Sequence, residues 1–247
     1  MKIYSGKTCQ ILGVQIAVTN MSDTVHFLCD HVEKLYGKYV CVSNVHTTVM
    51  AYDDVEYRKI QNNAAIVLPD GKPLSVVARM RGYKEAKKVS GPDLMPEIFA
   101  LSEKKGYTHF FYGSTEDTLR KLVDNLKGKY PKLKIVGAYA PPFRPLTEEE
   151  DGNVVQSIND ANADFLWVGL GAPKQEIWMA AHEDRVHSVM IGVGAGFDFH
   201  AGTVKRAPRW MQKCGLEWFY RLMQDPKRLW KRYLVTNAKF LCYLCKK

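Results

Sequence analysis

Short apolar runs, rich in β-branched and aromatic residues, recur through the first 200 residues and alternate with segments of helical periodicity. Runs of this length and composition predict buried β-strands. The six predicted strands span residues 38–44, 64–71, 107–113, 133–140, 164–171 and 188–196. Their alternation with helical segments predicts an α/β fold: a Rossmann-like, mainly parallel sheet with helices on both faces, which binds ligands at the carboxyl ends of its strands.

Two of the helical segments begin with capping residues. Ser114 or Thr115 is expected to cap the helix after strand 107–113. The side-chain oxygen of either residue can accept a hydrogen bond from an unpaired backbone amide in the first turn of that helix. Thr147 precedes three glutamates, whose charges favour a helix start. Both segments therefore predict surface helices between strands.

Residues 203–247 differ in charge from the rest of the chain. They hold seven lysines and five arginines against Glu217 and Asp225, a net charge of +10, while the whole chain carries +9. The first 202 residues therefore sum to about −1 by the same count. We predict an α/β catalytic domain over residues 1–202 and a basic, aromatic helical appendage over residues 203–247 that faces an anionic partner.

The appendage carries two further local signals. Pro226 predicts a break between two short helices, because proline cannot continue a helix from the preceding turn. Cys242 and Cys245 form one Cys-x-x-C pair without a second pair of zinc ligands, so we expect both to be apolar positions on a helix face.

Polar side chains follow two of the predicted strands. Ser43, Asn44 and His46 end strand 38–44, and Asp70 precedes Gly71 at the end of strand 64–71. Glycine allows a tight turn and the close approach of a ligand. Each position also has a structural interpretation: Asn44 as a helix cap, His46 as a structural residue and Asp70 as part of a turn. Their convergence on one edge of a parallel sheet favours a functional site.

A third strand exit resembles a phosphate-binding site. Strand 164–171 runs into Gly169-x-Gly171 and then a helix opening at Pro173, and proline suits a first helical position. The open amides and positive dipole end of such a helix attract phosphate, and Lys174 adds a cation there, unless it is merely a solvated surface lysine.

The sequence lacks the motifs that mark several other classes of protein. No apolar run reaches 18 residues and no signal peptide opens the chain, so we expect it to remain in the cytosol. The P-loop and the dinucleotide fingerprint are incomplete, which argues against a nucleotide-sugar epimerase or oxidoreductase. No Asp-x-Asp metal pair is present. We therefore predict no cofactor and no metal, so that protein cations and helix dipoles neutralise any diphosphate leaving group.

Five longer motifs carry a family resemblance over roughly residues 11–234. They are LPDG (68–71), VSGPDL (89–94), VGLGAPKQEIW (168–178), IGVGAGFDFHAGTVKRAPRWM (191–211) and GLEWFYRLMQDPKRLWKRYL (215–234). In these motifs the chain resembles the WecG/TagA/CpsF glycosyltransferases of bacterial cell-surface polymer synthesis.

The resemblance implies an activity and a set of site residues. The implied reaction moves a sugar, N-acetylmannosamine or a related hexose, from a UDP-sugar to an undecaprenyl-diphosphate-linked sugar, for a surface polysaccharide or teichoic acid. The general base of the family corresponds to Asp70, and Asn44 corresponds to a catalytic-site contact with the donor sugar. The remaining implied contacts to the donor are Gly171, Pro173, Lys174, Gln175, Glu176 and Asp198.

Two positions depart from the pattern of many relatives. Those relatives carry Thr-Pro-Asn where this chain has Val42, Ser43 and Asn44, so Ser43 is the nearest substitute hydroxyl, although it would leave the strand on the other face. They also carry arginine where this chain has Lys88, and lysine keeps the charge but loses bidentate phosphate recognition. Both departures leave the identity of the donor sugar open.

The appendage of the family is linked to membrane association and to completion of the active site. Lysines and arginines near anionic headgroups, with interfacial aromatic residues, predict peripheral binding at the cytoplasmic face of the membrane. We expect Leu222, Leu229, Trp230 and Tyr233 to form the apolar side of a surface helix. Four appendage arginines are candidates for the diphosphate: Arg206, Arg209, Arg221 and Arg228.

One alternative function class shares the basic, aromatic appendage. Such a segment could instead bind the phosphate backbone of a nucleic acid. A preference for anionic vesicles over oligonucleotides would distinguish membrane binding from nucleic-acid binding. The motifs favour the enzyme with no nucleic-acid partner. Self-association through a displaced appendage stays open as a homo-oligomer prediction.

Overall fold

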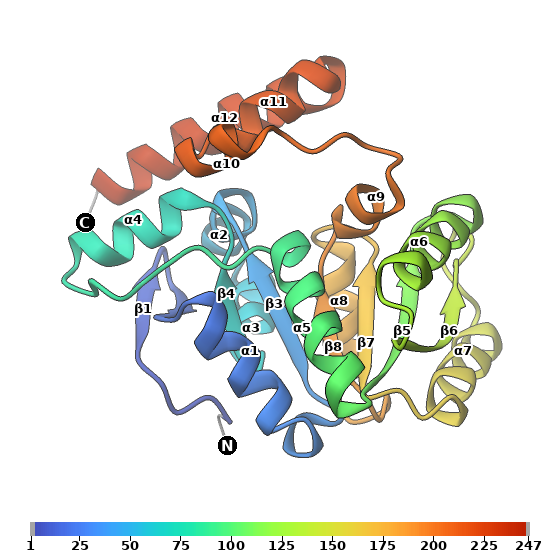
Figure 1. Ribbon diagram of the computed structural model, residues 1–247. Coiled ribbons are helices and arrows are strands. Elements are labelled where there is room, and N and C mark those ends of the chain that lie inside the picture. Colours follow the sequence, from blue (N-terminus) through green and yellow to red (C-terminus); the bar gives the residue numbers. More distant parts are fainter. Residues whose placement is uncertain (1–2, 246–247) are drawn as a thin grey trace.

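The computed structural model describes residues 3–245, apart from the side chains of Lys213 and Arg228. A six-stranded sheet in the order β4-β3-β8-β7-β5-β6 forms the centre, and every neighbouring pair in it is parallel. An antiparallel hairpin of β1 and β2 lies beside the β4 edge (Figure 1). The sheet confirms the predicted α/β class.

The strands and helices follow in sequence order. The strands are β1 (Thr8–Ile11), β2 (Val14–Ala17), β3 (Tyr39–Ser43), β4 (Ile66–Pro69), β5 (Thr108–Gly113), β6 (Lys134–Tyr139), β7 (Phe165–Gly169) and β8 (Val189–Gly192). The α-helices are α1 (Met21–Asp30), α2 (Val45–Asp53), α3 (Val55–Asn63), α4 (Lys72–Met80), α5 (Gly91–Lys105), α6 (Glu116–Lys129), α7 (Glu148–Asp160), α8 (Lys174–Ala181), α9 (Gly196–Ala201), α10 (Arg209–Cys214), α11 (Glu217–Gln224) and α12 (Pro226–Cys245), and a 3₁₀ turn spans Glu33–Leu35.

Each face of the sheet carries its own apolar core. Helices α2, α3, α7 and α8 pack on one face, and α1, α5, α6 and α9 pack on the other. Side chains of β3 alternate between them: Tyr39 and Cys41 belong to the first core, and Val40 and Val42 belong to the second. Because both faces are covered, strands β3, β4, β7 and β8 are buried along nearly their whole length, whereas the edge strand β6 is largely exposed.

The local predictions for strands and caps are confirmed. All six predicted strands are present, and Thr115 caps α6 by accepting from the amide of Thr118. Thr147 forms a capping box with Glu150 at the start of α7. The hairpin β1–β2 was not predicted.

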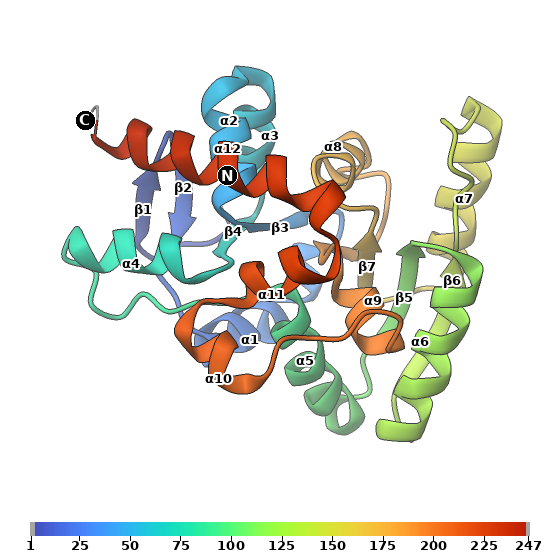
Figure 2. The ribbon, with the colours of Figure 1, turned by 90° about the horizontal axis from the view of Figure 1, so that it is seen from above.

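The appendage lies across the carboxyl ends of the strands, over α2 and above α4 and α5 (Figures 1 and 2). Pro226 begins α12, so the predicted break is confirmed. The prediction of two short helices is wrong, because three helices are present and α12 has 20 residues. Residues 246 and 247 of the predicted appendage, and residues 1 and 2 of the catalytic domain, lie outside the described part of the chain.

Two predictions about the apolar residues of the appendage are also wrong. Cys242 and Cys245 are exposed and are not fillers of a helix face. Leu229 is buried against the protein, whereas Trp230 is 55% exposed. Helix α12 therefore turns Leu229 inward and Trp230 outward, and Leu229 does not form part of an outward apolar surface. The appendage is tied down at its far end by Lys239 and Tyr243, whose polar atoms lie 2.7 and 2.8 Å from the Asp53 carboxylate.

Candidate active site

A cavity of about 1790 Å³ lies between the carboxyl ends of the strands and the appendage. Its lining combines strand-exit residues of the sheet with cations of the appendage. The lining includes Asn44, Asp70, Lys88, Gln175, Arg206 and Arg221. The predicted convergence of strand exits on one edge is therefore confirmed, because the exits of β3, β4, β7 and β8 all border this cavity.

Asp70 lies at the first of these exits, directly after β4. Its amide donates to the carbonyl of Ser43 at 2.7 Å, which joins the ends of β4 and β3. Gly71 then caps α4 with φ of 83°, a conformation that favours glycine. Burial raises the pKa of the Asp70 carboxyl to about 6, and Glu217 and Asp93 act in the same direction against Lys88. The carboxyl group can therefore exchange a proton near neutral pH.

Four charged side chains form a cluster beside Asp70. The Lys88 ammonium lies 3.4 Å from Asp93 and 3.3 Å from Glu217. The Arg206 guanidinium lies 2.7 Å from Asp93 and 2.8 Å from Glu217. Glu217 and Arg206 belong to residues 203–247, while Lys88 and Asp93 belong to the α/β body. The cluster therefore holds the appendage over the cavity by two pairs of opposite charges.

The ion pairs set the charge states of this cluster. Burial alone would raise the pKa of Asp93, but its contacts with Arg206 and Ser90 lower it to about 2. Burial opposes the charge on Arg206, yet its contacts with Asp93 and Glu217 raise its pKa. Both groups are ionised at neutral pH. The Nη2 atom of Arg206 is buried and has no hydrogen-bond partner within residues 3–245, so it can donate to a ligand oxygen.

A second arginine of the appendage lines the same cavity. Arg221 lies over the Phe199 ring at 5.5 Å from its centroid, and Arg206 lies over the same ring at 5.8 Å. Cation–π contacts at these distances orient both guanidinium groups. Phe199 follows Asp198 in α9, and Asp198 also lines the cavity, while its contact with the donor stays a prediction.

Asn44 lines the cavity and also caps α2. Its side-chain oxygen accepts from the amides of His46 and Thr47 at 3.0 and 3.3 Å. The structural interpretation of Asn44 as a cap is therefore confirmed, and its predicted donor contact stays a prediction. His46 lies in the cavity wall, where burial and then the charge of Arg232 lower its pKa to about 4. His46 is consequently neutral at physiological pH.

Gln175 joins the exits of β7 and β8. Its side-chain oxygen accepts from the amide of Gly171 at 3.2 Å and from the amide of Gly194 at 3.0 Å. Gly171, Pro173 and Lys174 border the cavity beside it, and the Lys174 side chain is exposed there. The amides of Gly171 and Gly194 already donate to Gln175. A phosphate at this point would therefore contact Lys174 and the unpaired backbone amides at the start of α8.

A buried chain of hydrogen bonds runs from Gln175 back to β3. The Gln175 amide donates to Glu176 at 2.8 Å, and the Tyr57 hydroxyl donates to the other Glu176 oxygen at 3.2 Å. Gln61 donates to Tyr57 at 2.9 Å, and Ser43 donates to Gln61. Glu176, Gln61 and Ser43 are at most 1% exposed. This chain links three strand exits through the core beneath them.

The predictions for Ser43 and Glu176 as substrate contacts are therefore wrong. Neither side chain lines the cavity. Ser43 leaves β3 on the face of Tyr39 and Cys41, because side chains alternate along a strand. Glu176 turns into the core one position after Gln175. Both residues support the wall from behind.

Of the four predicted appendage arginines, two line the cavity, one lies outside its lining, and one has a side chain outside the described residues. Arg209 begins α10, is exposed and lies outside the lining, so that prediction is wrong. The side chain of Arg228 lies outside the described residues. Arg206 and Arg221 do line the cavity.

Sequence reasoning missed several lining residues. Glu217 was not predicted, although an acid isolated in a basic segment is a signal for a specific partner. Asp93 does not line the cavity but pairs with Lys88 and Arg206 beside it, and it was also overlooked within the 89–94 motif. At the far end of the cavity, Tyr112 and Trp178 stack with their ring centroids 4.4 Å apart. Such a pair is assembled only when β5 and α8 meet, so it leaves no local pattern.

The described residues contain neither a metal-binding cluster nor a membrane-spanning helix. Between residues 3 and 245, no three His, Cys, Asp or Glu side chains gather in a group that could hold a metal ion. No helix in the same part of the chain is long and apolar enough to cross a membrane.

Comparison with known proteins adds to this geometry. The family described as glycosyl transferase WecG/TagA/CpsF matches residues 9–247. An N-acetylglucosaminyldiphosphoundecaprenol N-acetyl-beta-D-mannosaminyltransferase of Bacillus subtilis (strain 168) is 31% identical over 230 residues, 92% of this chain and 88% of that protein. A protein of the same name from Bacillus spizizenii strain W23 is 27% identical over 210 residues, 85% of this chain and 79% of that protein. The chain is therefore a glycosyltransferase and belongs to the WecG/TagA/CpsF family.

Proposed function

We propose that this enzyme moves N-acetylmannosamine, or a closely related hexose, from a UDP-sugar to an undecaprenyl-diphosphate-linked sugar, in the synthesis of a surface polysaccharide or teichoic acid. The names of the two relatives support an N-acetylmannosaminyl product and an N-acetylglucosaminyl-diphosphoundecaprenol acceptor. One observation carries the proposal: a carboxyl group with a pKa of about 6, Asp70, shares a cavity with appendage cations.

Asp70 is the general base of the proposed reaction. It takes the proton of an acceptor hydroxyl while that oxygen bonds to the anomeric carbon of the donor sugar. The bond from the anomeric carbon to the diphosphate oxygen breaks, and UDP leaves with the bonding electrons. A positioned base of this kind contributes about 10²–10⁴-fold to rate. A raised pKa suits the task, because the carboxylate is then basic enough to accept a proton and still ionised at neutral pH.

The leaving diphosphate needs positive charge, which this chain supplies from two parts. Lys88 belongs to the body, while Arg206 and Arg221 belong to the appendage. Glu217 and Asp93 neutralise Lys88 and Arg206 in the structure. A diphosphate would compete with these carboxylates for the two cations, and Arg206 offers Nη2 as a further donor. The reaction then needs no metal, since fixed cations stabilise the developing charge.

The appendage couples the enzyme to the membrane that holds the acceptor. Its exposed aromatic residues include Trp210, Trp218 and Trp230, which are 62%, 39% and 55% exposed. Together with the net charge of +10 over residues 203–247, they favour peripheral binding to an anionic bilayer at its cytoplasmic face. A self-associated form, with the appendage displaced, is a separate prediction that the oligomeric state in solution tests.

Release of UDP tests the proposal directly. The purified chain is given a panel of UDP-sugars, N-acetylglucosaminyl-diphosphoundecaprenol or a shorter analogue, and EDTA. We expect release with one donor, unchanged by EDTA and lowered about 10²–10⁴-fold by Asp70→Asn. Asp30→Asn is the matched control, because Asp30 is exposed at the end of α1 and outside the cavity. Release that needs a metal, or that survives in Asp70→Asn, would contradict the mechanism.

A further inference from the structure

One branch of the cavity is apolar and runs outward along α4. Pro73, Val76, Val77 and Met80 all line the cavity and follow the spacing i, i+3, i+4 and i+7. Residues at these spacings share one face of a helix. Helix α4 begins two residues after Asp70, so this face leads away from the proposed base toward the surface.

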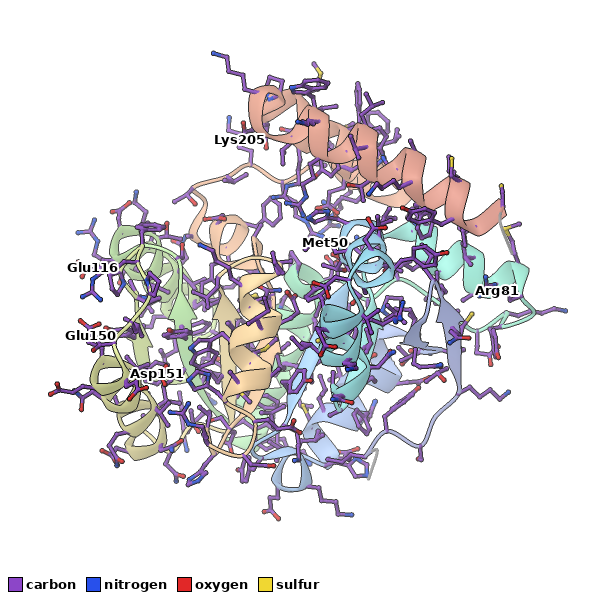
Figure 3. All side chains as sticks on the ribbon, turned by 180° about the vertical axis from the view of Figure 1, so that it is seen from behind. Met50, Arg81, Glu116, Glu150, Asp151 and Lys205 are labelled. Atoms are coloured by element: carbon purple, nitrogen blue, oxygen red, sulfur yellow. The ribbon has the colours of Figure 1, made fainter. Side chains whose placement is uncertain are left out.

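Helix α12 supplies the opposite wall. Tyr233, Asn237, Phe240, Leu241 and Leu244 line the same cavity and again repeat at helical spacing. The lining becomes more apolar toward the C-terminal end of α12. Both helices extend past β4 toward the hairpin, with Arg81 at the outer end of α4 (Figures 1 and 3), and seen from above α4 lies to one side of α12 (Figure 2). We call the space lined by Val76, Val77, Met80, Phe240, Leu241 and Leu244 the α4–α12 groove.

The mouth of the groove exposes apolar side chains. Met80 is 82% exposed and Leu241 is 64% exposed, and Val76 is 37% exposed nearer to Asp70. Clustered apolar exposure inside a concave surface marks a binding site, because each of these side chains gains by leaving water. At the inner end the lining changes to the polar and charged residues Asp70, Lys72 and Lys88.

We propose that the α4–α12 groove binds the isoprene units next to the diphosphate of the acceptor, and so selects acceptors that carry a prenyl chain. This inference rests on the proposed function. A ligand with a sugar, a diphosphate and then a hydrocarbon chain matches the order of the lining: base, cations and apolar walls. Helix α4 has nine residues, so its wall is about 13 Å long and covers only the start of a long chain.

The order of the lining residues, from base to cations to apolar walls, favours a lipid over an apolar peptide or a second protein chain as the occupant. The groove is continuous with the cavity that holds Asp70, so a single molecule can lie in the groove and present a sugar to Asp70. Lys72 lines the cavity at the first residue of α4, where a diphosphate between sugar and prenyl chain would lie. A peptide would have to satisfy its backbone groups against walls that offer mainly hydrocarbon at the mouth.

Two acceptors that differ only in the chain test the groove. One carries N-acetylglucosaminyl diphosphate on a three-isoprene chain, and the other carries the same head group on a methyl group. The double variant Met80→Gln/Leu241→Gln changes the mouth, and Met223→Gln/Leu234→Gln is the matched control. The control residues are 69% and 66% exposed on α11 and α12 and lie outside the cavity lining. All assays use the full chain without vesicles, so membrane binding does not contribute.

We expect wild type to have a KM for the prenyl acceptor about tenfold or more below that for the methyl acceptor, a difference of about 1.4 kcal/mol. The groove variant should lose this preference and keep its KM for the methyl acceptor, while the control should retain both values. Equal KM values for the two acceptors in wild type, or an equal loss of preference in the control variant, would overturn the assignment of the groove as a prenyl site. The proposed function would not be affected by either result. Transfer to neither acceptor would overturn the proposed function and this inference with it.

Discussion

The side-chain amide of Gln175 donates to the carboxylate of Glu176 at 2.8 Å, deep in the core behind the cavity. This contact fixes which end of the Gln175 amide faces the strand exits. The oxygen end is left to accept from Gly171 and Gly194. One Glu176 oxygen accepts from Gln175 and the other from Tyr57, so Glu176 orders the cavity wall without touching its contents.

Glu176→Gln should therefore impair the enzyme from behind the site. A glutamine at this position would turn a donor toward Gln175 or Tyr57, and a buried polar group without a partner costs about 1–3 kcal/mol. We expect a loss of that size in the free energy of unfolding, and about a tenfold or greater loss in kcat/KM for the donor. Denaturant titration and initial rates measure the two effects.

Glu97→Gln is the control for Glu176→Gln, because Glu97 is exposed on α5. Tyr57→Phe removes one donor to Glu176 and retains the ring, so it should cause a smaller loss of the same kind. Unchanged donor kinetics in Glu176→Gln would contradict a positioning role for this carboxylate.

The pH dependence of the reaction should follow Asp70. Its folded pKa of about 6 lies above the usual aspartate range, so the base form grows as pH rises through 6. We expect kcat/KM to fall below pH 6 and to level off above pH 7, when measured with saturating acceptor across pH 4.5–8.5. A kcat/KM that stays constant from pH 8.5 down to about pH 5 would show that burial does not perturb the working base.

The same shift predicts that Asp70 destabilises the fold at neutral pH. The folded state binds the proton more tightly than the unfolded chain, so ionisation between about pH 4 and pH 6 costs the folded state free energy. Asp70→Asn should therefore be more stable than wild type at pH 8, by at most about 3 kcal/mol, and should lose this advantage below pH 4. Chemical denaturation at both pH values measures it, with Asp30→Asn as the reference. An equal difference at both pH values would contradict the argument.

Two appendage arginines offer a matched comparison. Arg221 lines the cavity and lies over Phe199, whereas Arg209 is exposed outside the lining. A hydrogen bond to a charged group contributes about 1.5–3 kcal/mol, so Arg221→Gln should lower kcat/KM by about 10- to 100-fold. Arg209→Gln should keep its rate on a water-soluble acceptor. Equal losses in both variants would indicate a general effect of charge.

Removal of the appendage should abolish activity and membrane binding together. A chain ending at Gly202 lacks Arg206, Glu217 and Arg221, and it also loses Phe240 from the apolar core, so we expect no detectable transfer. The full chain should bind vesicles with anionic lipid more tightly than oligonucleotides at equal salt, because its aromatic residues gain at a bilayer interface. Full activity of the shortened chain, or a preference for oligonucleotides, would contradict the role of the appendage.

The six strands of the main sheet, the helix caps and the polar residues at the strand ends were predictable, because each depends on residues that are close in the sequence. Apolar runs such as residues 164–171 identify strands, and Thr147 with its glutamates identifies the start of α7. Asp70 followed by Gly71 needs only the observation that a polar residue and a flexible one end an apolar run. A parallel sheet then brings its carboxyl ends to one edge, so the region of the site follows from the fold class.

The direction of individual side chains was harder to predict. Glu176 and Gln175 are adjacent in the same motif, yet one faces the core and the other borders the cavity. Ser43 and Asn44 differ in the same way at the end of β3. One residue rotates a side chain by about 100° in a helix and to the opposite face in a strand, so an error of one position exchanges a ligand for a core residue.

The amino-acid sequence by itself determined the α/β fold, the edge that carries the site, the candidate base and the basic character of residues 203–247. Only the tertiary structure decided which cations meet that base. Lys88 and Glu217 are 129 positions apart, and Arg206 meets Asp93 from another part of the chain. Local patterns cannot encode such pairs, because they form only when the appendage lies over the strand ends and brings opposite charges together.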